Sequence, residues 1–227
     1  MSPTRAQTRA NYDRLSRWYD LLAGSSERAL RDLGLRELAV RGGERVLEIG
    51  AGTGAALVEL ARAAGPAGLA AGVDLSTGMC RETGLRIADF GLRIGSPLRA
   101  GMVCGDAVRL PVACDSLDAI FMSFALELFD EYDMQAVLAE CRRVLRPGGR
   151  LCVVAMAEPV RPTPMTRLYA WAHGRFPAAI DCRPIGVSQV LALGGFDVGR
   201  LSRHSLWGLP VEVALARAGQ TATEETG

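Results

Sequence analysis

The sequence contains no lysine, so all 26 of its basic residues are arginines. A chain without lysine has no Schiff-base nucleophile and no phosphate-binding lysine of the P-loop type. Histidine is nearly absent as well, because only two of the 227 residues are histidines. Catalysis that depends on either residue type is therefore excluded or confined to very few positions.

An excess of charge of one sign is also lacking. The 26 basic and 25 acidic residues give a formal net charge of +1. A protein that binds nucleic acid through phosphate contacts normally carries a basic excess or a basic stripe. The sequence has neither, so we expect no nucleic-acid partner.

Long apolar runs and metal-binding cysteine patterns are missing too. The longest fully apolar run, residues 151–157, is far too short to cross a bilayer, and the charged first thirty residues contain no secretory signal. The six cysteines include no C-x-x-C pair, which argues against a zinc site or a compact disulfide framework. Cys104 and Cys152 lie in apolar runs and are expected in the core. We expect a cytoplasmic protein without an integral membrane segment.

From residue 45 onward, short apolar runs alternate with helical segments. Strands that alternate with helices of ten or more residues predict a parallel sheet with right-handed crossovers, and continuous apolar strands predict a sheet covered on both faces. Pro147-Gly148-Gly149 indicates a turn before the fifth strand. The expected strands are 45–49, 69–73, 102–104, 117–122, 151–157, 196–201 and 211–216, and the expected helices are 55–64, 77–88, 133–145 and 187–193.

The remaining segments fit one domain over residues 1–227. Helical spacing of apolar residues over 10–40, broken at Gly24-Ser25-Ser26, predicts two helices, with Ser26 as the N-cap of the second. Residues 157–186 interrupt the regular pattern with prolines and aromatics, and the polar residues 218–227 are expected to be a disordered tail.

The strongest motif is the glycine loop of residues 50–54, between the first strand and its helix. Glycine allows a sharp turn and close approach of a ligand to the main chain. In open α/β sheets, ligands bind at the carboxyl ends of the strands. The same residues also satisfy the dinucleotide fingerprint, as Gly50-x-Gly52-x-x-Ala55, and a tight turn without a ligand is a third interpretation.

Asp74 ends the second strand and is the second candidate for a ligand contact. Its carboxylate can accept hydrogen bonds from both hydroxyls of a ribose, which fits either NAD or S-adenosylmethionine (SAM). The alternative is that Asp74 caps the helix that begins near Thr77, although Ser76 is better placed for that role.

Asp106 distinguishes the two cofactors. It follows the third strand in Gly105-Asp106-Ala107, where its carboxylate can accept from an exocyclic adenine amine. Together with Leu110-Pro111 and the turn at residues 143–149, this order resembles the class I SAM-dependent methyltransferases, and within them the UbiE/COQ5-type family. The resemblance covers about residues 10–215.

The resemblance implies a Rossmann-like α/β fold with seven strands, mostly parallel, and an antiparallel last strand. It also implies SAM as the cofactor. The N-terminal segment of that family resembles Asn11-Tyr12-Asp13 and Trp18-Tyr19-Asp20 of this chain, where an aromatic ring could contact the sulfonium. Tyr12 and Trp18 fit ordinary packing against the sheet equally well. The implied cofactor-binding residues are Tyr19, Glu48, Gly50, Ala51, Gly52, Gly54, Asp74, Leu75, Met79, Asp106, Ala107 and Ser123.

The sequence departs from the quinone-methylating members of that family after the fourth strand. Those members carry a segment similar to F-G-L-R-N, whereas this chain has Phe124-Ala-Leu-Glu-Leu128. Glu127 therefore stands in place of the arginine, which puts methylation of a quinone ring carbon in doubt.

The acceptor side is expected in residues 157–186 together with the N-terminal helices. Aromatic and apolar residues there suit a flat or lipophilic acceptor. His173 and Asp181 are the catalytic candidates, with a structural role as the alternative, and no metal is expected. Methyl transfer needs a base only when the acceptor holds its proton tightly.

Three functions remain open from the residues. The first is a methyltransferase that acts on a small apolar or amphipathic molecule, such as a quinone-like compound or a lipid, and contacts membranes at most peripherally. The second is a SAM-binding protein without catalysis. The third is an NAD(P)-dependent oxidoreductase, which would lack any Tyr-x-x-x-Lys pair. The oligomeric state is not determined by the sequence.

Overall fold

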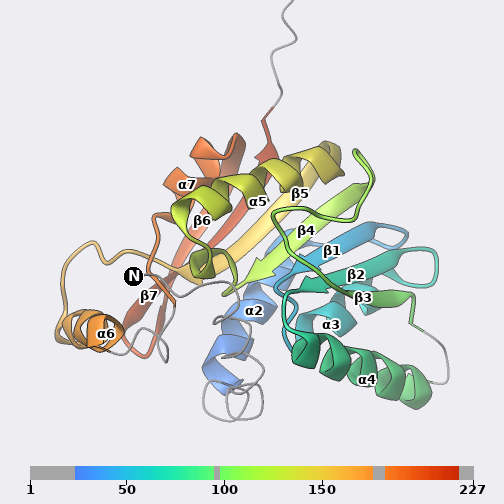
Figure 1. The fold of residues 1–227 in the computed structure, drawn as a ribbon, viewed down its shortest axis with the longest axis horizontal. Coiled ribbons are helices and arrows are strands. Elements are labelled where there is room, and N and C mark those ends of the chain that lie inside the picture. The colour runs from blue at the N-terminus through green and yellow to red at the C-terminus, as the bar shows by residue number, and fades with distance from the viewer. Residues whose placement is uncertain (1–23, 95–97, 176–181, 220–227) are drawn as a thin grey trace, which may run out of the picture.

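The computed structural model describes residues 24–94, 98–175 and 182–219, in which helices and strands alternate (Figure 1). No helix within these ranges is long and apolar enough to cross a membrane. The helices are α2 (Gly24–Leu38), α3 (Ala55–Ala64), α4 (Thr77–Ile94), η1 (Leu126–Leu128, 3-10), α5 (Glu131–Val144), α6 (Pro164–Arg175) and α7 (Val187–Leu193), and the strands are β1 (Arg45–Ile49), β2 (Leu69–Asp74), β3 (Ala100–Cys104), β4 (Leu117–Ser123), β5 (Leu145–Met156), β6 (Phe196–Leu206) and β7 (Leu209–Ala218).

The strands form one sheet in the order β3-β2-β1-β4-β5-β7-β6. All neighbours are parallel except β7, which is antiparallel to both β5 and β6. Trp207 and Gly208, with φ angles of 50° and 83°, form the two-residue turn between β6 and β7. Two residues can join antiparallel strands but cannot make a parallel crossover. The α/β class, the seven strands and the antiparallel last strand are thus confirmed.

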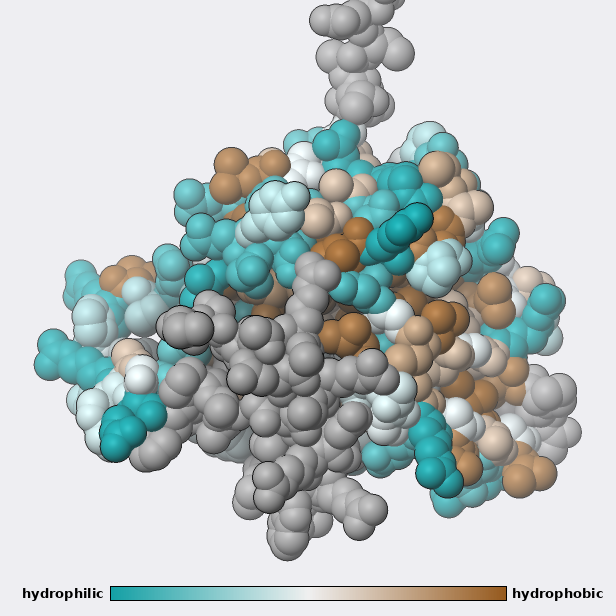
Figure 2. All heavy atoms as spheres, viewed as in Figure 1, coloured by the Kyte–Doolittle hydropathy of each residue, from teal (hydrophilic) through white to brown (hydrophobic). Residues whose placement is uncertain are grey.

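Helices cover both faces of the sheet (Figure 1). Leu47 and Ile49 of β1 pack in the cluster that contains α5 and α7, whereas Val46 packs with α2 and α3 on the other face. This follows from the two-residue period of a strand, which directs successive side chains to opposite faces. On the surface seen in Figure 2, hydrophobic side chains are interspersed with hydrophilic ones.

The strand order reverses at β1, which pairs with β2 on one side and with β4 on the other. The crossovers that follow β1 and β4 leave in opposite directions. The carboxyl ends of these two strands therefore border a crevice at the switch point. Ile49, Asp74 and Ser123 are the last residues of β1, β2 and β4. The fold therefore places the glycine loop at the edge where ligands bind in such sheets.

The fifth strand begins earlier than predicted, at Leu145 instead of Leu151. Leu117 of β4 pairs with Leu145, while Ala119 pairs with Arg150, so residues 146–149 leave the ladder as a bulge. Gly148 has a φ of 79° within it. The predicted turn at residues 147–149 is therefore an interruption within one strand.

Several other boundaries differ from the sequence prediction. The helix α2 begins at Gly24, so Ser26 lies inside the helix instead of capping it, and α4 continues to Ile94. The preceding predicted helix lies outside the described residues. A helix, α6, forms where an irregular segment was expected.

The start of α6 has a local cause. Pro164 is its first residue, where a missing backbone N–H has no cost. The Thr166 N–H donates to Thr163 Oγ1 at 3.2 Å, and the Thr163 N–H donates to Thr166 Oγ1 at 2.8 Å. This reciprocal pair resembles a capping box, so the helix begins where its exposed amides find partners.

The prediction for Cys104 was wrong. Cys152 is buried in the central strand β5, but Cys104 is exposed. The reason is that β3 is an edge strand, paired with β2 on one side only. An apolar sequence run does not distinguish an edge strand from a central one.

Candidate functional site

The glycine loop, residues 50–54, connects β1 to α3 through three residues with positive φ. Gly50, Gly52 and Gly54 have φ angles of 69°, 52° and 78°, which side chains rarely permit. A Cβ on Gly50 would lie 2.5 Å from the Cβ of Ala125, and one on Gly54 would lie 2.5 Å from Cγ2 of Thr83. A Cβ on Gly52 would meet nothing within 4 Å. The main chain at Gly52 therefore borders open space that a ligand can approach.

Hydrogen bonds hold this loop from two sides. The Gly50 N–H donates to the carbonyl of Val73 in β2 at 2.8 Å. The buried hydroxyl of Thr83 in α4 donates to the Gly52 carbonyl at 2.7 Å. Sequence reasoning did not single out Thr83, because nothing in α4 alone shows that the helix packs against the loop.

Asp74, the second residue that the sequence predicts for a cofactor contact, lies beside the glycine loop. Its Oδ2 accepts the Gly52 N–H at 2.9 Å, and its Oδ1 accepts the Ser76 N–H at 2.9 Å. A carboxylate has about four acceptor positions, so these bonds do not exhaust its capacity. Ser76 caps α4, because its Oγ accepts the Met79 N–H at 3.2 Å. The competing role of Asp74 as the helix cap is thereby excluded.

Glu48 is a buried carboxyl group on β1, with only 4% of the residue exposed. Burial raises its pKa well above 4.5, the nearby charge of Arg31 opposes that rise, and Asp74 adds to it. The carboxylate accepts a hydrogen bond from the Leu57 N–H in the first turn of α3. Its Oε2 accepts none from the residues that the structure describes. A buried acceptor of this kind is costly, and a cationic donor would compensate for it.

Arg31 on α2 provides the opposite charge near Glu48. Its Nη2 donates to Asp32 Oδ1 at 3.1 Å. Its Nε is buried and donates to no acceptor among the described ranges. Sequence reasoning missed this residue because α2 showed only an amphipathic pattern. Glu48 and Arg31 together complement a group that carries both an ammonium and a carboxylate.

The third predicted carboxylate, Asp106, follows β3 at the same edge of the sheet. Asp74 and Cys104 are register partners at the ends of β2 and β3, and Asp106 lies two residues after Cys104. Its Oδ1 accepts the Val108 N–H at 3.1 Å, which fixes the turn. Met79 and Ala107 are buried nearby in the chain, and Leu75 and Ser123 are partly buried.

Of the two catalytic candidates, the structure describes only His173. His173 lies on α6, where it stacks on Tyr169 with ring centroids 6.4 Å apart, and Tyr169 Oη donates to the Cys182 carbonyl at 2.6 Å. In Figure 1, α6 lies at one end of the molecule and β1–β3 lie towards the other. Asp181 and Tyr19, like Tyr12 and Trp18, lie outside the described residues.

Glu127 is the buried residue that replaces the arginine of the quinone-methylating sequences. It lies in η1 directly after β4 and is 1% exposed. Its Oε1 accepts the N–H of Met156, the last residue of β5, at 3.1 Å. The carboxylate thus lies between the carboxyl ends of β4 and β5, where the chain enters residues 157–186.

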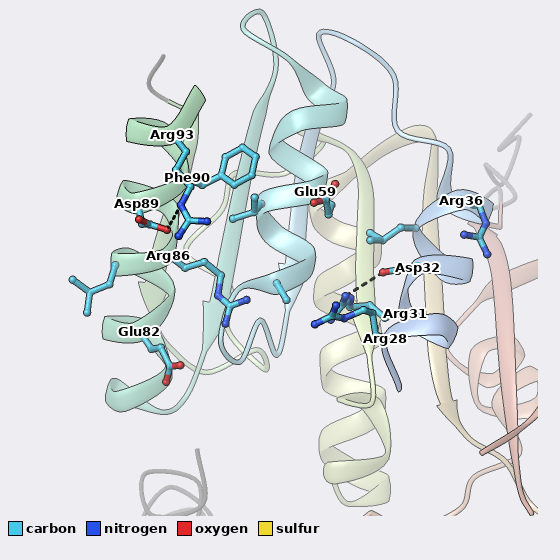
Figure 3. Close-up of a pocket in the computed structure, with 14 residues that line it drawn as sticks. Arg28, Arg31, Asp32, Arg36, Glu59, Glu82, Arg86, Asp89, Phe90 and Arg93 are labelled. Carbon is cyan, nitrogen blue, oxygen red and sulfur yellow. Dashed lines mark hydrogen bonds and ion pairs between the residues drawn. The ribbon is translucent and has the colours of Figure 1, made fainter. Parts of the chain in front are cut away.

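A hollow of about 1060 Å³ lies beside this site, between α2, α3 and α4 (Figure 3). Its walls contain five arginines and four carboxylates from these helices. Asp32 pairs with Arg31, and Asp89 pairs with Arg93 at 3.0 Å, and ion pairs of this kind are typical of a solvated helix surface. Glycine loop residues 50–54 do not line this hollow, so we do not assign it as the reaction site.

Comparison with known proteins agrees with this arrangement. A family model described as a methyltransferase domain matches residues 46–149, which include the glycine loop, Asp74 and Asp106. The demethylmenaquinone methyltransferase of Corynebacterium kroppenstedtii is 34% identical over 155 residues, which cover 66% of this chain and 60% of that protein. Over residues 46–149 the chain is therefore similar to a methyltransferase domain, and over about two thirds of its length it is similar to quinone methyltransferases.

A second relative is the ubiquinone/menaquinone biosynthesis C-methyltransferase UbiE of Burkholderia cenocepacia, which is 33% identical over 149 residues that cover 66% of this chain and 57% of that protein. The chain thus spans 57–60% of the length of these relatives. The solved 1,6-didemethyltoxoflavin-N1-methyltransferase of Burkholderia thailandensis, which contains S-adenosylhomocysteine, has a TM-score of 0.69 and 17% identity, with 95% of this chain and 88% of that chain covered. At that identity the similarity shows the fold alone.

Proposed function

We propose that this protein transfers the methyl group of SAM to a small apolar or amphipathic acceptor. The observation that carries the proposal is the arrangement at the carboxyl edge of the sheet. Arg31 offers a cation there, Glu48 offers a buried carboxyl group that a cationic ligand would hold in its charged form, and Asp74 contacts the glycine loop beside them. A sulfonium nucleoside with an amino-acid tail requires this combination of groups.

The residues present fit SAM at each end of the molecule. Asp74 accepts from the ribose hydroxyls and Asp106 from the exocyclic adenine amine. Glu48 receives the ammonium of the methionine end and Arg31 its carboxylate, so the buried Glu48 Oε2 and Arg31 Nε both gain a partner. The other proposed contacts are made by Gly50, Ala51, Gly52, Gly54, Leu75, Met79, Ala107 and Ser123.

The cofactor supplies a methyl group already activated by its sulfonium. The protein then has to align the acceptor with that methyl group and exclude water, which is an effect of proximity and orientation. A base is required only for an acceptor that holds its proton tightly, and His173 and Asp181 remain the proposed candidates.

The proposed acceptor is lipophilic because of the surface that follows β5. Met165, Leu168 and Trp171 of α6 are all exposed, and so is Trp207 in the turn between β6 and β7. A Cβ on Gly208 would lie 3.4 Å from Cγ of Met165, so α6 and this turn are adjacent. Exposed apolar side chains in one region favour an apolar ligand or peripheral contact with a lipid surface.

The relatives' names point to quinones, whereas Glu127 points to a different acceptor within the same class. A buried carboxylate at the end of β4 favours an acceptor that donates a hydrogen bond, such as a hydroxyl or an amine on an apolar molecule. We therefore propose that such a compound is methylated in preference to the ring carbon of a quinone.

The deciding experiment uses SAM with a labelled methyl group and an extract of small molecules and lipids, followed by identification of the labelled product. Demethylmenaquinone is assayed in parallel, with wild type and with Glu127→Gln. A labelled oxygen or nitrogen product that depends on Glu127 supports the proposal. Tight SAM binding without turnover on any acceptor would instead indicate a non-catalytic SAM-binding protein, and tight NAD binding without SAM binding would indicate an oxidoreductase.

A further inference from the structure

Two thiols lie together beside the proposed adenosine end of the site. Cys80 is in the first turn of α4, and Cys104 is the last residue of β3. They are 24 positions apart in the chain, but β3 pairs with β2, and α4 follows β2 directly. The fold therefore brings both thiols to the segment of Asp74 and Leu75.

Hydrogen bonds fix the position of each sulfur. Cys80 Sγ donates to the Asp74 carbonyl at 3.5 Å, and Cys104 Sγ donates to the Leu75 carbonyl at 3.6 Å. The Cys104 thiol is a neighbour of Cys80, close enough to contribute to the raised pKa of that thiol. The two sulfurs thus contact the carbonyls of consecutive residues, and the effect of Cys104 on Cys80 shows that they are close to each other.

The two thiols differ in their access to solvent. Cys104 is exposed, whereas Cys80 is only partly so. Burial, together with the contact from Cys104 and the charge of Asp74, raises the pKa of Cys80 to about 12. An oxidant in solution therefore meets Cys104 first, with Cys80 directly behind it as the second sulfur.

We propose that Cys80 and Cys104 form a reversible disulfide that lowers the affinity of the protein for SAM. Only the effect on affinity rests on the proposed function, since formation of the disulfide depends on the two thiols alone. Among the described residues there is no group of three or more His, Cys, Asp or Glu side chains that could hold a metal ion.

The reaction requires an oxidant, for which we name a low-molecular-weight disulfide such as oxidised glutathione. The Cys104 thiolate attacks one sulfur of glutathione disulfide and releases one glutathione. Cys80 then loses its proton and attacks the Cys104 sulfur of the mixed disulfide, which releases the second glutathione. Two protein thiols are oxidised, one glutathione disulfide is reduced to two thiols, and the two protons end on the leaving thiolates.

The disulfide affects SAM because it changes the main chain at the ribose-binding residue. Joining the sulfurs requires a bond of about 2.05 Å with a dihedral near 90°, which draws β3 and the first turn of α4 together. It also removes both thiol donors from the carbonyls of Asp74 and Leu75. The segment that carries Asp74 and, beyond β3, Asp106 then leaves the geometry that fits adenosine.

The test incubates the full chain in glutathione buffers of graded potential, blocks the remaining thiols, and maps tryptic peptides. The diagnostic species joins the peptides of residues 63–81 and 100–109. SAM affinity of the same samples is measured by calorimetry. We expect the linked peptides to appear as affinity falls by about tenfold, a typical coupling between two sites.

Linkage provides a second measurement. If the disulfide weakens SAM binding tenfold, saturating SAM must shift the midpoint of disulfide formation by about 30 mV in the oxidising direction. The Cys80→Ser and Cys104→Ser variants should bind SAM equally in all buffers. Cys114→Ser, which changes another exposed thiol, should behave like wild type.

Two results would overturn the inference. One is the absence of the linked peptides under conditions in which Cys114 is already glutathionylated. The other is a linked protein that binds SAM as tightly as the reduced one. Failure of the reduced protein to bind SAM would instead refute the proposed function, whatever the peptide map shows.

Discussion

Asp74 accepts the backbone N–H of Gly52, with 2.9 Å between Oδ2 and the nitrogen. Asp74, which the sequence predicts as the ribose contact, is thus hydrogen-bonded to the predicted cofactor-binding loop of residues 50–54. Because Thr83 holds the Gly52 carbonyl from the opposite direction, the peptide on either side of Gly52 is fixed by α4 and β2 together. The two sequence motifs form one structural unit.

Replacing Asp74 tests this unit directly. In Asp74→Asn, one of the two acceptor oxygens becomes an NH2 group, which cannot accept from a ribose hydroxyl or a main-chain N–H. We expect SAM binding to weaken by about 2–3 kcal/mol, because hydrogen bonds to a charged group contribute about 1.5–3 kcal/mol each and do not add fully. Calorimetry measures the loss, with Asp197→Asn on exposed β6 as the control. Unchanged affinity in a folded Asp74→Asn protein would show that the ribose binds elsewhere.

The role of the glycine loop can be tested at Gly52, with Gly148 in the bulge of β5 as the matched control. Both have positive φ, 52° and 79°, and a Cβ on either would meet nothing within 4 Å. Alanine at either position should cost about 1 kcal/mol in unfolding free energy, because the left-handed conformation strains an L residue. Only Gly52→Ala should also weaken SAM binding. Equal SAM affinity in the two variants would show that the open side of Gly52 does not face the cofactor.

Glu48→Gln should increase the stability of the cofactor-free protein at neutral pH while it weakens SAM binding. The pKa of Glu48 is raised well above 4.5 by burial. When the pKa of a carboxyl group is higher in the folded than in the unfolded state, the unfolding free energy falls as pH rises above the unfolded pKa. A neutral amide does not titrate, so it removes this loss of stability. Denaturant unfolding and calorimetry measure the two effects. A variant that is both less stable and unchanged in SAM affinity would show that Glu48 is purely structural.

Arg31 can be tested with a ligand that lacks the amino-acid tail. Arg31→Gln should weaken S-adenosylhomocysteine binding by about tenfold or more, since a charge-assisted hydrogen bond contributes about 1.5–3 kcal/mol. It should not affect 5′-methylthioadenosine, which has no carboxylate. Arg36→Gln, at another position in the same hollow, is the matched control. Equal losses for both ligands would mean that Arg31 acts through the fold and not through the carboxylate.

A pH effect on stability is expected from Glu44 and Arg150. Burial alone would raise the pKa of Glu44, but hydrogen bonds from Arg150 and from the Arg41 N–H outweigh it and lower the pKa from 4.5. A lowered folded pKa gives stability that is present above about pH 4.5 and is lost as pH falls through the folded value. Glu44→Gln should therefore lower the unfolding free energy by about 1–3 kcal/mol at pH 7 and have a shrinking effect in acid.

Urea unfolding at graded pH measures this difference. Glu59→Gln, which removes a surface pair with Arg62, should change stability by less than about 1 kcal/mol at every pH. A Glu44→Gln effect that stays constant down to about pH 3 would show that the carboxylate charge is not what stabilises the pair.

The positions of the strands, and the placement of Asp74 and the glycine loop at their carboxyl ends, could be predicted from the sequence. Buried parallel strands are short apolar runs, and a chain that repeats strand and helix has few ways to arrange them. The residues that were missed act over long separations. Thr83 and Arg31 reach the site from α4 and α2, so their roles depend on helix packing and leave no local pattern.

The boundaries failed for similar reasons. The bulge at 146–149 exists because β4 pairs on both sides of it, at Leu145 and at Arg150, which neither strand shows alone. Exposure of Cys104 depends on the place of β3 in the sheet and not on its composition. The acceptor side is the least predictable, because residues 157–186 follow no repeating pattern.

The place of β7 between β5 and β6 has a consequence for synthesis of the chain. Strand β5 ends at Met156, and its partner β7 does not begin until Leu209. At ribosomal rates of about 5–20 residues per second, the free edge of β5 waits about 3–10 s for its partner. That edge carries Leu151 to Met156, an uncharged apolar run that a second nascent chain could pair with. Production of the folded protein therefore depends on how quickly the last hairpin follows, and slow translation over residues 157–208 favours aggregation.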